Sequence, residues 1–211
     1  MPRAPPAWKR KVREARAAAA RGDPRGLDAL LGALRWRYDA ARNEAVACLA
    51  SLESPPVTRL LALARSGDTA VERRAALDAL ARIDGAQARP AMRRAFADPN
   101  MVVRRAAIAA AVRLHDVSGV PVIARLLRDP SGGVRVFAAH ALGRLGGRRA
   151  VPALIRATRD PKWYVRQAAC TSLGVLGDSR ALAALRVASR DPRPAVARAA
   201  QEALHLLANP C

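Results

Sequence analysis

The chain has 211 residues, with 37 lysines and arginines against 17 aspartates and glutamates, and a formal net charge of +20. Its three cysteines have no metal-ligand spacing and no run of about 18 apolar residues occurs, which argues against a disulfide framework and a membrane-spanning helix. Only Lys9, Lys11 and Lys162 are lysine, so the charge is mostly arginine and favours nucleic acid, acidic proteins or anionic lipid as partners.

The amino-terminal part predicts a cap followed by a first repeat. We expect an irregular stretch over residues 1–7, and then a basic helix over residues 8–21 that covers the array. Asp23-Pro24 is typical of a helix start, and the leucines that follow point inward at helical spacing. The arginine-rich start also matches an organelle transit peptide, but the absence of an apolar signal segment makes a soluble cytoplasmic protein the primary prediction.

The rest of the chain repeats one phrase, Asp-Pro-x-x-x-Val-Arg-x-x-Ala-Ala. It returns at Asp98, Asp129, Asp160 and Asp191, with a constant spacing of 31 residues. An earlier copy is divergent, because Gly67-Asp68 replaces Asp-Pro and Glu72 replaces the valine. Such a period without insertions predicts a stacked array in which each unit buries its apolar face against its neighbours.

The unit over residues 129–159 predicts a helix hairpin. We expect Asp129-Pro130 to supply the N-cap and the first helical position, and Gly146-Gly147 to end the helix with a left-handed glycine. A second helix is expected to open near Val151-Pro152 and to end at Arg159, a cation at the negative helix end. Gly143 and Gly174 are interpreted as glycines at close helix contacts.

Counting these elements gives thirteen helices: an N-terminal helix followed by six hairpins. The predicted fold is all-α, a right-handed α-solenoid that forms one domain over residues 1–211. Its basic N-terminal segment and capping helix are expected over residues 1–22, and its repeats over residues 23–211.

The run from Asp129 to Gly146, followed by Ala-Val-Pro-Ala-Leu-Ile-Arg from residue 150, resembles the short HEAT repeats of the phycobilisome-lyase type. The segment from Asp160 to Gly177 repeats the run closely, and the resemblance extends from about residue 23 onward. It implies the fold but only weakly a function, because such repeats occur in scaffolds, chaperones, bilin lyases, a di-iron hydroxylase acting on deoxyhypusine, and DNA glycosylases.

The same resemblance implies a ladder of charges between successive repeats. It pairs the arginine six residues after each aspartate with these aspartates, as a structural rather than a binding feature; the residues are Asp98, Arg104, Asp129, Arg135, Asp160 and Arg166. The last unit departs from the pattern, since residue 197 is alanine and the arginine is Arg198. We therefore expect the ladder to end before Asp191.

The sequence contains no motif that indicates a catalytic or metal-binding site. The hydroxylase branch of the family uses His-Glu pairs as iron ligands, whereas His115, His140 and His205 have no adjacent glutamate. We expect no metal, no cofactor and no catalytic residues. Trp163 and Tyr164 could form an aromatic contact on the concave face, although at least one could simply cover the neighbouring helix. No aspartate beside Trp163 matches the essential one of the HEAT-like glycosylases.

Arginines at two positions of the first helix of each repeat are the strongest functional signal. Eight residues separate the two positions, so both lie near one helix face, and stacking would place the arginines in a concave basic patch: Arg74, Arg82, Arg105, Arg113 and Arg144. Compensation of the helix dipole is an alternative explanation for the second position. Acidic residues on the same helices dilute the patch.

These observations favour a non-catalytic scaffold that holds a protein partner, expected to be acidic, in its concave groove. The alternative is a solenoid that binds nucleic acid through the concave arginines. A bilin lyase subunit or a lesion-recognising protein similar to DNA glycosylases is a more remote alternative. The sequence names neither the partner nor the oligomeric state.

Overall fold

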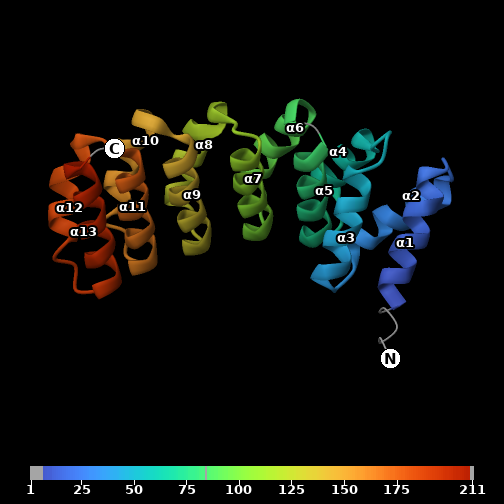
Figure 1. Cartoon of the computed structure of the whole chain (residues 1–211), viewed down its shortest axis with the longest axis horizontal. Helices are drawn as coiled ribbons and strands as arrows, with labels where there is room; N and C mark the ends of the chain where they lie inside the picture. The colour runs from blue at the N-terminus through green and yellow to red at the C-terminus, as the bar shows by residue number, and fades with distance from the viewer. Residues whose placement is uncertain (1–6, 84, 210–211) are drawn as a thin grey trace. The chain divides into compact units, whose positions relative to one another are not determined.

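The computed structural model describes residues 7–83 and 85–209, and every regular element within these residues is helical (Figure 1). Thirteen α-helices follow one another, with four short 3-10 helices between them. The expected all-α solenoid fold and the expected number of helices are therefore confirmed. No helix of the described residues is long and apolar enough to span a membrane. Of the irregular start expected over residues 1–7, residues 1–6 lie outside the described residues, and Ala7 already belongs to the first helix.

The chain divides into two compact units, residues 1–110 and 111–211, which are described separately. The first unit contains α1 (Ala7–Ala20), α2 (Pro24–Gly32), η1 (Ala33–Arg35), α3 (Asp39–Ala50), α4 (Val57–Ser66), α5 (Ala70–Ile83), α6 (Gly85–Ala95) and most of α7 (Met101–Arg113). The second contains η2 (Val117–Gly119), α8 (Val120–Arg125), η3 (Leu126–Arg128), α9 (Gly132–Leu145), α10 (Gly147–Ala157), α11 (Trp163–Leu176), η4 (Ser179–Ala181), α12 (Leu182–Ala188) and α13 (Pro194–Ala208). One continuous array over residues 1–211 stays a prediction.

The helices of the second unit form two layers. Helices α9, α11 and α13 pack side by side, with α11 between the other two, and are called the first-helix layer. Helices α8, α10 and α12, with η2, η3 and η4, are called the second-helix layer, in which α10 contacts α8, η3 and η4. Each hairpin contributes one helix to each layer, so a residue recurs in the same layer one repeat later.

Small residues set the spacing of the first-helix layer. A Cβ atom at Gly143 of α9 would lie 2.9 Å from the Cβ of Ser172 in α11, and one at Gly174 of α11 would lie 2.9 Å from the Cβ of Ala203 in α13. Such distances leave no room for a side chain. The prediction that Gly143 and Gly174 lie at close helix contacts is confirmed.

The first helix of each hairpin begins later than the sequence predicts. The carboxylates of Asp98, Asp129, Asp160 and Asp191 each accept the backbone N–H two residues on, at 2.8–2.9 Å. Asp129 itself has an extended backbone (φ −59°, ψ 142°), as a residue before proline prefers, and α9 begins only at Gly132. The prediction of Asp129 as the N-cap and Pro130 as the first helical residue is therefore wrong, because the carboxylate closes a local turn ahead of the helix.

The second helix of the same repeat begins earlier than predicted. Gly147 has a positive φ of 48°, and α10 starts there, so that Pro152 lies inside the helix rather than at its start. Proline has no N–H for the carbonyl four residues earlier, which belongs to Arg148. That carbonyl instead accepts a hydrogen bond from Nη2 of Arg180 at 2.8 Å. A contact from the next repeat thus satisfies the group that the internal proline leaves free.

Candidate functional site

Arginine–aspartate pairs connect successive repeats in the second unit. Nε and Nη2 of Arg135 donate to the two carboxylate oxygens of Asp160 at 2.7 and 2.9 Å. Arg166 makes the same two-bonded contact with Asp191, also at 2.7 and 2.9 Å. Each arginine therefore pairs with the aspartate of the following repeat, 25 residues on. The expectation that the ladder ends before Asp191 is wrong, because its partner belongs to the preceding repeat.

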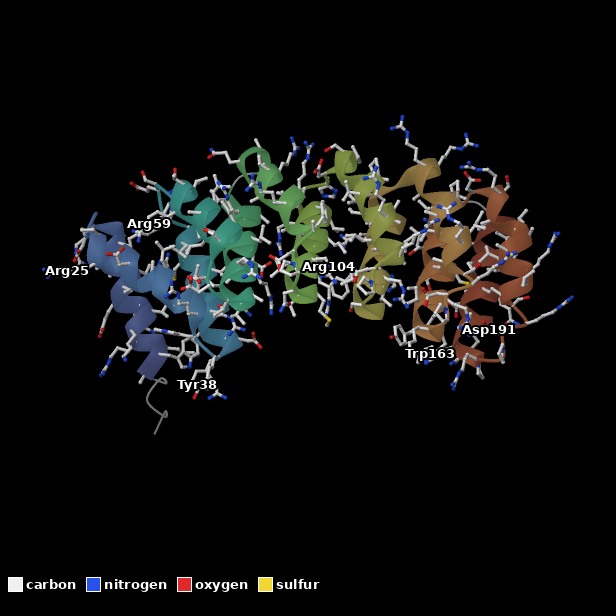
Figure 2. The ribbon with its side chains drawn as sticks, turned by 180° about the vertical axis from the view of Figure 1, so that it is seen from behind. Arg25, Tyr38, Arg59, Arg104, Trp163 and Asp191 are labelled. Carbon is white, nitrogen blue, oxygen red and sulfur yellow. The ribbon has the colours of Figure 1, made fainter. Side chains whose placement is uncertain are left out.

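The remaining guanidinium nitrogens are also engaged. Nη1 of Arg135 donates to the backbone carbonyl of Asp129 at 2.9 Å, and Nη1 of Arg166 donates to that of Asp160 at 2.9 Å. The Arg135 and Arg166 side chains are only 11% and 16% exposed. Figure 2 shows Asp191 ahead of α13, the helix that packs against α11. These arginines clamp two loops together and leave little of the guanidinium for a ligand.

The first unit contains the same contact at a position that the sequence analysis missed. Arg73 donates to both carboxylate oxygens of Asp98, at 2.8 and 3.0 Å, and to the carbonyl of Gly67 at 2.9 Å. Arg104 donates to the carbonyls of Asp98 and Pro99 at 2.8 and 3.0 Å. Arg73 lies one repeat length before Arg104, so the period itself could have identified it, although its own repeat lacks the Asp-Pro signal.

The paired aspartates are acidic groups whose ionised form is stabilised by the fold. The Arg166 guanidinium holds the pKa of Asp191 below its usual range, and the Arg180 guanidinium does the same for the pKa of Asp178. Burial raises the pKa of Asp98, but hydrogen bonds from Arg73 and from the Asn100 N–H outweigh it and leave the pKa lowered. The charged state of these carboxylates is thus part of the folded structure.

Acid should therefore destabilise the protein. A carboxyl group whose pKa is lower in the folded than in the unfolded chain stabilises the fold above its unfolded pKa, and that stability is lost as the pH falls through the folded pKa. We expect a constant melting temperature from pH 8 to about pH 5.5, and a progressive fall below about pH 4, where unfolded aspartates take up protons. Circular dichroism melts in a pH series measure this. An Asp191→Asn variant should show a shallower fall, and a wild-type melting temperature unchanged at pH 3 would contradict the expectation.

The five arginines predicted for a concave basic patch are distributed over both units. Arg74 is half-buried in α5 and lies 3.6 Å from a carboxylate oxygen of Asp78, while Arg82 is exposed in the last turn of the same helix. Arg105, in α7, is half-buried in the first unit. Arg113 and Arg144 are exposed in the last turns of α7 and α9 in the second unit. A joint surface made by the five stays a prediction.

The aromatic pair lies on the first turn of α11. Trp163 and Tyr164 are 40% and 37% exposed, and their rings meet edge to face with centroids 5.8 Å apart and an interplanar angle of 77°. The Tyr164 hydroxyl lies over Gly132 of α9, where a Cβ atom would be 2.5 Å away. Tyr164 therefore partly covers the neighbouring helix, and both rings keep a solvent-accessible side. Figure 2 shows Trp163 at the end of its helix.

Histidines and cysteines do not gather into a site in the described residues. No group of three or more His, Cys, Asp or Glu side chains there could hold a metal ion. Burial lowers the pKa of His140 and raises the pKa of the Cys170 thiol to about 12. Cys48 is also buried and free, and burial raises its pKa too. Thiols of this kind are inert as nucleophiles.

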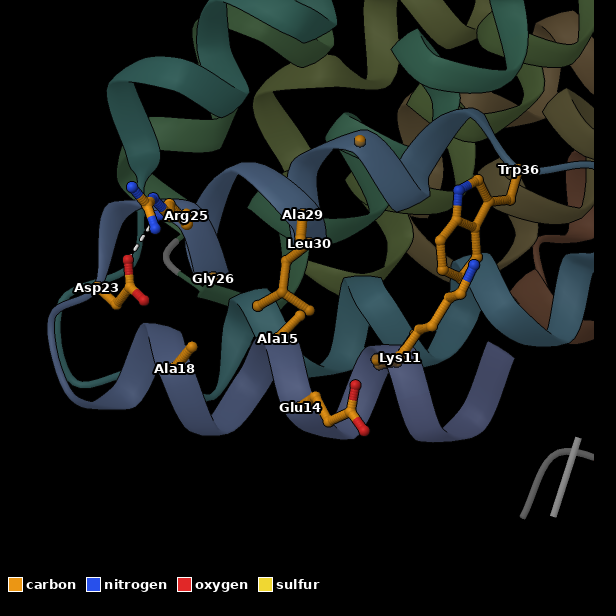
Figure 3. Close-up of a pocket in the computed structure, with 12 residues that line it drawn as sticks. Lys11, Glu14, Ala15, Ala18, Asp23, Arg25, Gly26, Ala29, Leu30 and Trp36 are labelled. Atoms are coloured by element: carbon orange, nitrogen blue, oxygen red, sulfur yellow. Dashed lines mark hydrogen bonds between the residues drawn. The ribbon is translucent and has the colours of Figure 1, made fainter. Parts of the chain in front are cut away.

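A groove of about 580 Å³ lies between α1 and α2 in the first unit (Figure 3). Its walls include Ala15, Leu30 and Trp36. The Asp23 carboxylate at its edge already accepts the Arg25 N–H at 2.9 Å as the N-cap of α2. Lys11 and Glu14 also line it. We assign the groove no ligand.

Comparisons with solved structures find helical repeat proteins. The Escherichia coli protein YibA is 20% identical with a TM-score of 0.62, covering 90% of this chain and 74% of that one. Human deoxyhypusine hydroxylase, solved with glycerol, is 21% identical with a TM-score of 0.52, over 96% and 81% of the two chains. A designed armadillo repeat protein in complex with the peptide (KR)4 is 16% identical with a TM-score of 0.58, over 95% and 99%. At these identities the likeness concerns the fold alone.

The comparison with curated proteins finds no match. The family model for HEAT repeats matches residues 57–130 and 119–205, which is most of the chain and includes the repeat starts at Asp98, Asp129, Asp160 and Asp191. The phycobilisome-lyase subtype receives no support from these matches. Because the model matches more than half of the chain, the chain belongs to the HEAT-repeat family.

Proposed function

We propose that the protein is a non-catalytic HEAT-repeat scaffold, and that the first-helix layer of its second unit binds an acidic segment of a partner protein. The observation that carries the proposal is the group of partly exposed aromatic rings on this layer. Trp163 and Tyr164 lie on α11, and Phe137, on α9, is 36% exposed. Arg144 is exposed on α9 as well.

The composition of this surface is that of a protein-binding site. Trp, Tyr and Arg dominate the energetics of protein interfaces, because they combine a large apolar area with hydrogen-bonding groups. One repeat length after Arg144 lies Val175, 64% exposed, and one further lies Leu206, 50% exposed. The row thus continues across three helices, and at about 8–10 Å between helix axes it spans roughly 20 Å. An extended segment of about six residues matches that length.

Charge selects an acidic segment over a basic one. Residues 111–211 contain 15 arginines and one lysine but only six acidic residues. Of these six, five are aspartates with little exposure, and Glu202 is exposed on α13. The designed armadillo protein mentioned above was solved with a peptide of Lys and Arg, (KR)4. The same peptide would meet like charges here, so the preferred sequence should have the opposite sign.

The proposal predicts binding of an acidic, partly apolar peptide. A fluorescein-labelled (Glu-Leu)4 peptide should bind the full chain in a polarisation titration at 150 mM salt, and (Lys-Leu)4 should not. Trp163→Ala and Arg144→Glu should each weaken binding about tenfold, as the loss of about 1.4 kcal/mol from an interface anchor would. Thermal melts establish that the variants are folded.

The matched control is Val117→Ala, a change at a side chain that is 65% exposed but belongs to η2 in the other layer. It should leave peptide affinity within twofold. Equal affinity for the acidic and the basic peptide, or equal affinity of the wild type and the Trp163→Ala variant, would exclude this surface as the binding site.

A further inference from the structure

Six exposed arginines of the second unit lie in the last turns of α8, η3, α10 and α12 or in the turns that follow α10 and α12, and this set is called the second-layer arginine surface. They are Arg125, Arg128, Arg156, Arg159, Arg186 and Arg190. Arg148, Arg149 and Arg180, near the opposite ends of these segments, are exposed as well but do not belong to the set. Arg128, Arg159 and Arg190 are spaced by one repeat length, as are Arg125 and Arg156. The repeat therefore places the same charge at the same position of successive hairpins.

None of the six arginines forms a salt bridge or a side-chain hydrogen bond with the residues that the structure describes. The buried arginines of the same unit, Arg135 and Arg166, are by contrast fully engaged with aspartates. The unit thus contains arginines that hold repeats together and arginines that display their charge to solvent, while Arg148 and Arg180 are exposed and also pair with Asp178.

Acidic residues do not neutralise this surface. The segments 117–128, 147–159 and 179–190 contain no aspartate and no glutamate. Five aspartates flank the three segments, and all have little exposure: Asp116, Asp129, Asp160, Asp178 and Asp191. Asp160 and Asp191 are held by ladder arginines, and Asp178 is held by Arg148 and Arg180. Uncompensated charge of one sign on one face raises the local concentration of anions.

The surface also contains a shallow hollow. A cavity of about 180 Å³ lies between the α8–η3 segment and α10, and Arg128, Arg156 and Arg159 line it. Its other walls are small or apolar side chains, such as Ala124 and Ala153, and Asp160. Both carboxylate oxygens of Asp160 already accept hydrogen bonds from Arg135. Two successive repeats thus contribute arginines to one depression, where a single anionic group can meet more than one guanidinium.

The chemistry of the surface distinguishes among anionic partners. Guanidinium groups match phosphate oxygens with two parallel hydrogen bonds, which favours phosphates. The three segments contain no Phe, Trp, Tyr or His. Single-stranded nucleic acid would therefore find no ring on which its bases could stack, and a membrane surface would find no aromatic side chain to insert between its lipids. An acidic protein would lack the aromatic anchors that protein interfaces use. The phosphate backbone of a regular duplex can be bound without any aromatic side chain.

We propose that the second-layer arginine surface binds the phosphate backbone of duplex nucleic acid without regard to base sequence. This goes beyond the proposed scaffold function, because it uses the opposite helices of the same hairpins and a different class of partner. The scaffold would then hold a protein segment on one layer and a nucleic-acid duplex on the other.

The test is a salt titration of affinity with the full chain and two unrelated, fluorescein-labelled 20-bp DNA duplexes. Four phosphate contacts predict a log–log slope of about −3.6, and a loss of roughly 150-fold between 50 and 200 mM salt. The two duplexes should bind within threefold of each other. The Arg156→Glu, Arg159→Glu double variant should weaken binding at least tenfold and reduce the slope by about 2.

The control variant changes the net charge equally on the other layer. Arg193 is exposed at the N-cap of α13 and Arg198 is exposed within the same helix, and the Arg193→Glu, Arg198→Glu double variant should weaken binding less than threefold. An equal loss in both double variants would mean that net charge or the first-helix layer binds the duplex, and would overturn the proposal. If the glutamates unfold the chain, Arg156→Gln with Arg159→Gln replaces them, with the same direction expected.

Two further probes separate the other anions. Vesicles containing 30% phosphatidylserine and the (Glu-Leu)4 peptide are titrated with the same variants. If the chain binds vesicles more tightly than duplex, and the Arg156 and Arg159 variants weaken vesicle binding, the partner of this surface is a membrane and the proposal is wrong. If Arg144→Glu loses peptide binding and keeps duplex binding, the two partners bind to separate surfaces, as proposed. If the wild-type chain binds the peptide but not the duplex, this inference is wrong and the proposed scaffold function is unaffected.

Discussion

The free energy of unfolding of an Arg135→Ala variant is expected to be about 3 kcal/mol lower than that of the wild type, which is the usual cost of removing one partner from a buried ion pair. The substitution deletes two bonds to Asp160 and one to the Asp129 carbonyl. It leaves the Asp160 carboxylate, only 7% exposed, without the cation that offsets its burial. Urea denaturation followed by circular dichroism measures the change.

Arg159→Ala is the matched control for this prediction, because it also removes a guanidinium from the second unit but deletes no ion pair and no side-chain hydrogen bond with described residues. It should change stability by less than about 0.5 kcal/mol. Arg135→Lys should recover little, since an ammonium group cannot make the paired bonds of the guanidinium fork. Equal midpoints for Arg135→Ala and Arg159→Ala would show that the ladder contributes nothing to stability.

A comparable loss, of about 3 kcal/mol, is expected for Gly143→Val, through overpacking of a closed helix contact. Any Cβ at this position would lie 2.9 Å from both the Cβ and the Oγ of Ser172. Ser172 cannot withdraw easily, because its hydroxyl donates to the carbonyl of Ala139 at 2.9 Å in a buried position. Gly143→Ala should cost less, since its single methyl group needs a smaller shift and alanine favours the helix.

The same helix offers the control. A Cβ at Gly133 of α9 would find its nearest neighbour, Oγ of Ser131, at an ordinary 3.6 Å. Gly133→Ala should therefore be neutral or should stabilise by up to about 1 kcal/mol, since alanine restricts the unfolded chain and favours the helix. If Gly143→Val unfolds at the same urea concentration as Gly133→Ala, the close contact between α9 and α11 is not maintained in solution.

The helix content and the glycine contacts were predictable because they depend on local pattern and on a constant period. The role of Asp129 was not. An Asp-Pro pair fits both a helix cap and a turn ahead of a helix, and residues far along the chain decide between them. The Asp160 carboxylate, for example, must turn toward Arg135, 25 residues earlier. The Asp-Pro pair alone does not indicate which distant arginine the aspartate contacts.

The 31-residue period could have predicted both Arg73, the ladder arginine of the first unit, and the second-layer arginine surface. Other interpretations of the same residues were preferred instead. Arg73 follows Gly67-Asp68, so a search for Asp-Pro passes over it, although it stands one repeat before Arg104. Compensation of the helix dipole accounts for an arginine at each of the three helix ends, Arg128, Arg159 and Arg190. It does not explain why acidic residues are missing from all three segments.

The burial of aspartate together with the display of arginine makes the surface charge of the second unit insensitive to pH in the physiological range and to the common modifications of lysine and arginine. Arginine does not lose its proton at any physiological pH, so acidification or alkalinisation of the surroundings leaves the charge in place. Acetylation acts on lysine, and Lys162 is the single lysine of residues 111–211. Methylation of arginine preserves its charge and changes only its hydrogen bonding. Ionic strength and competing polyanions are therefore the variables to which anion binding by this unit should respond.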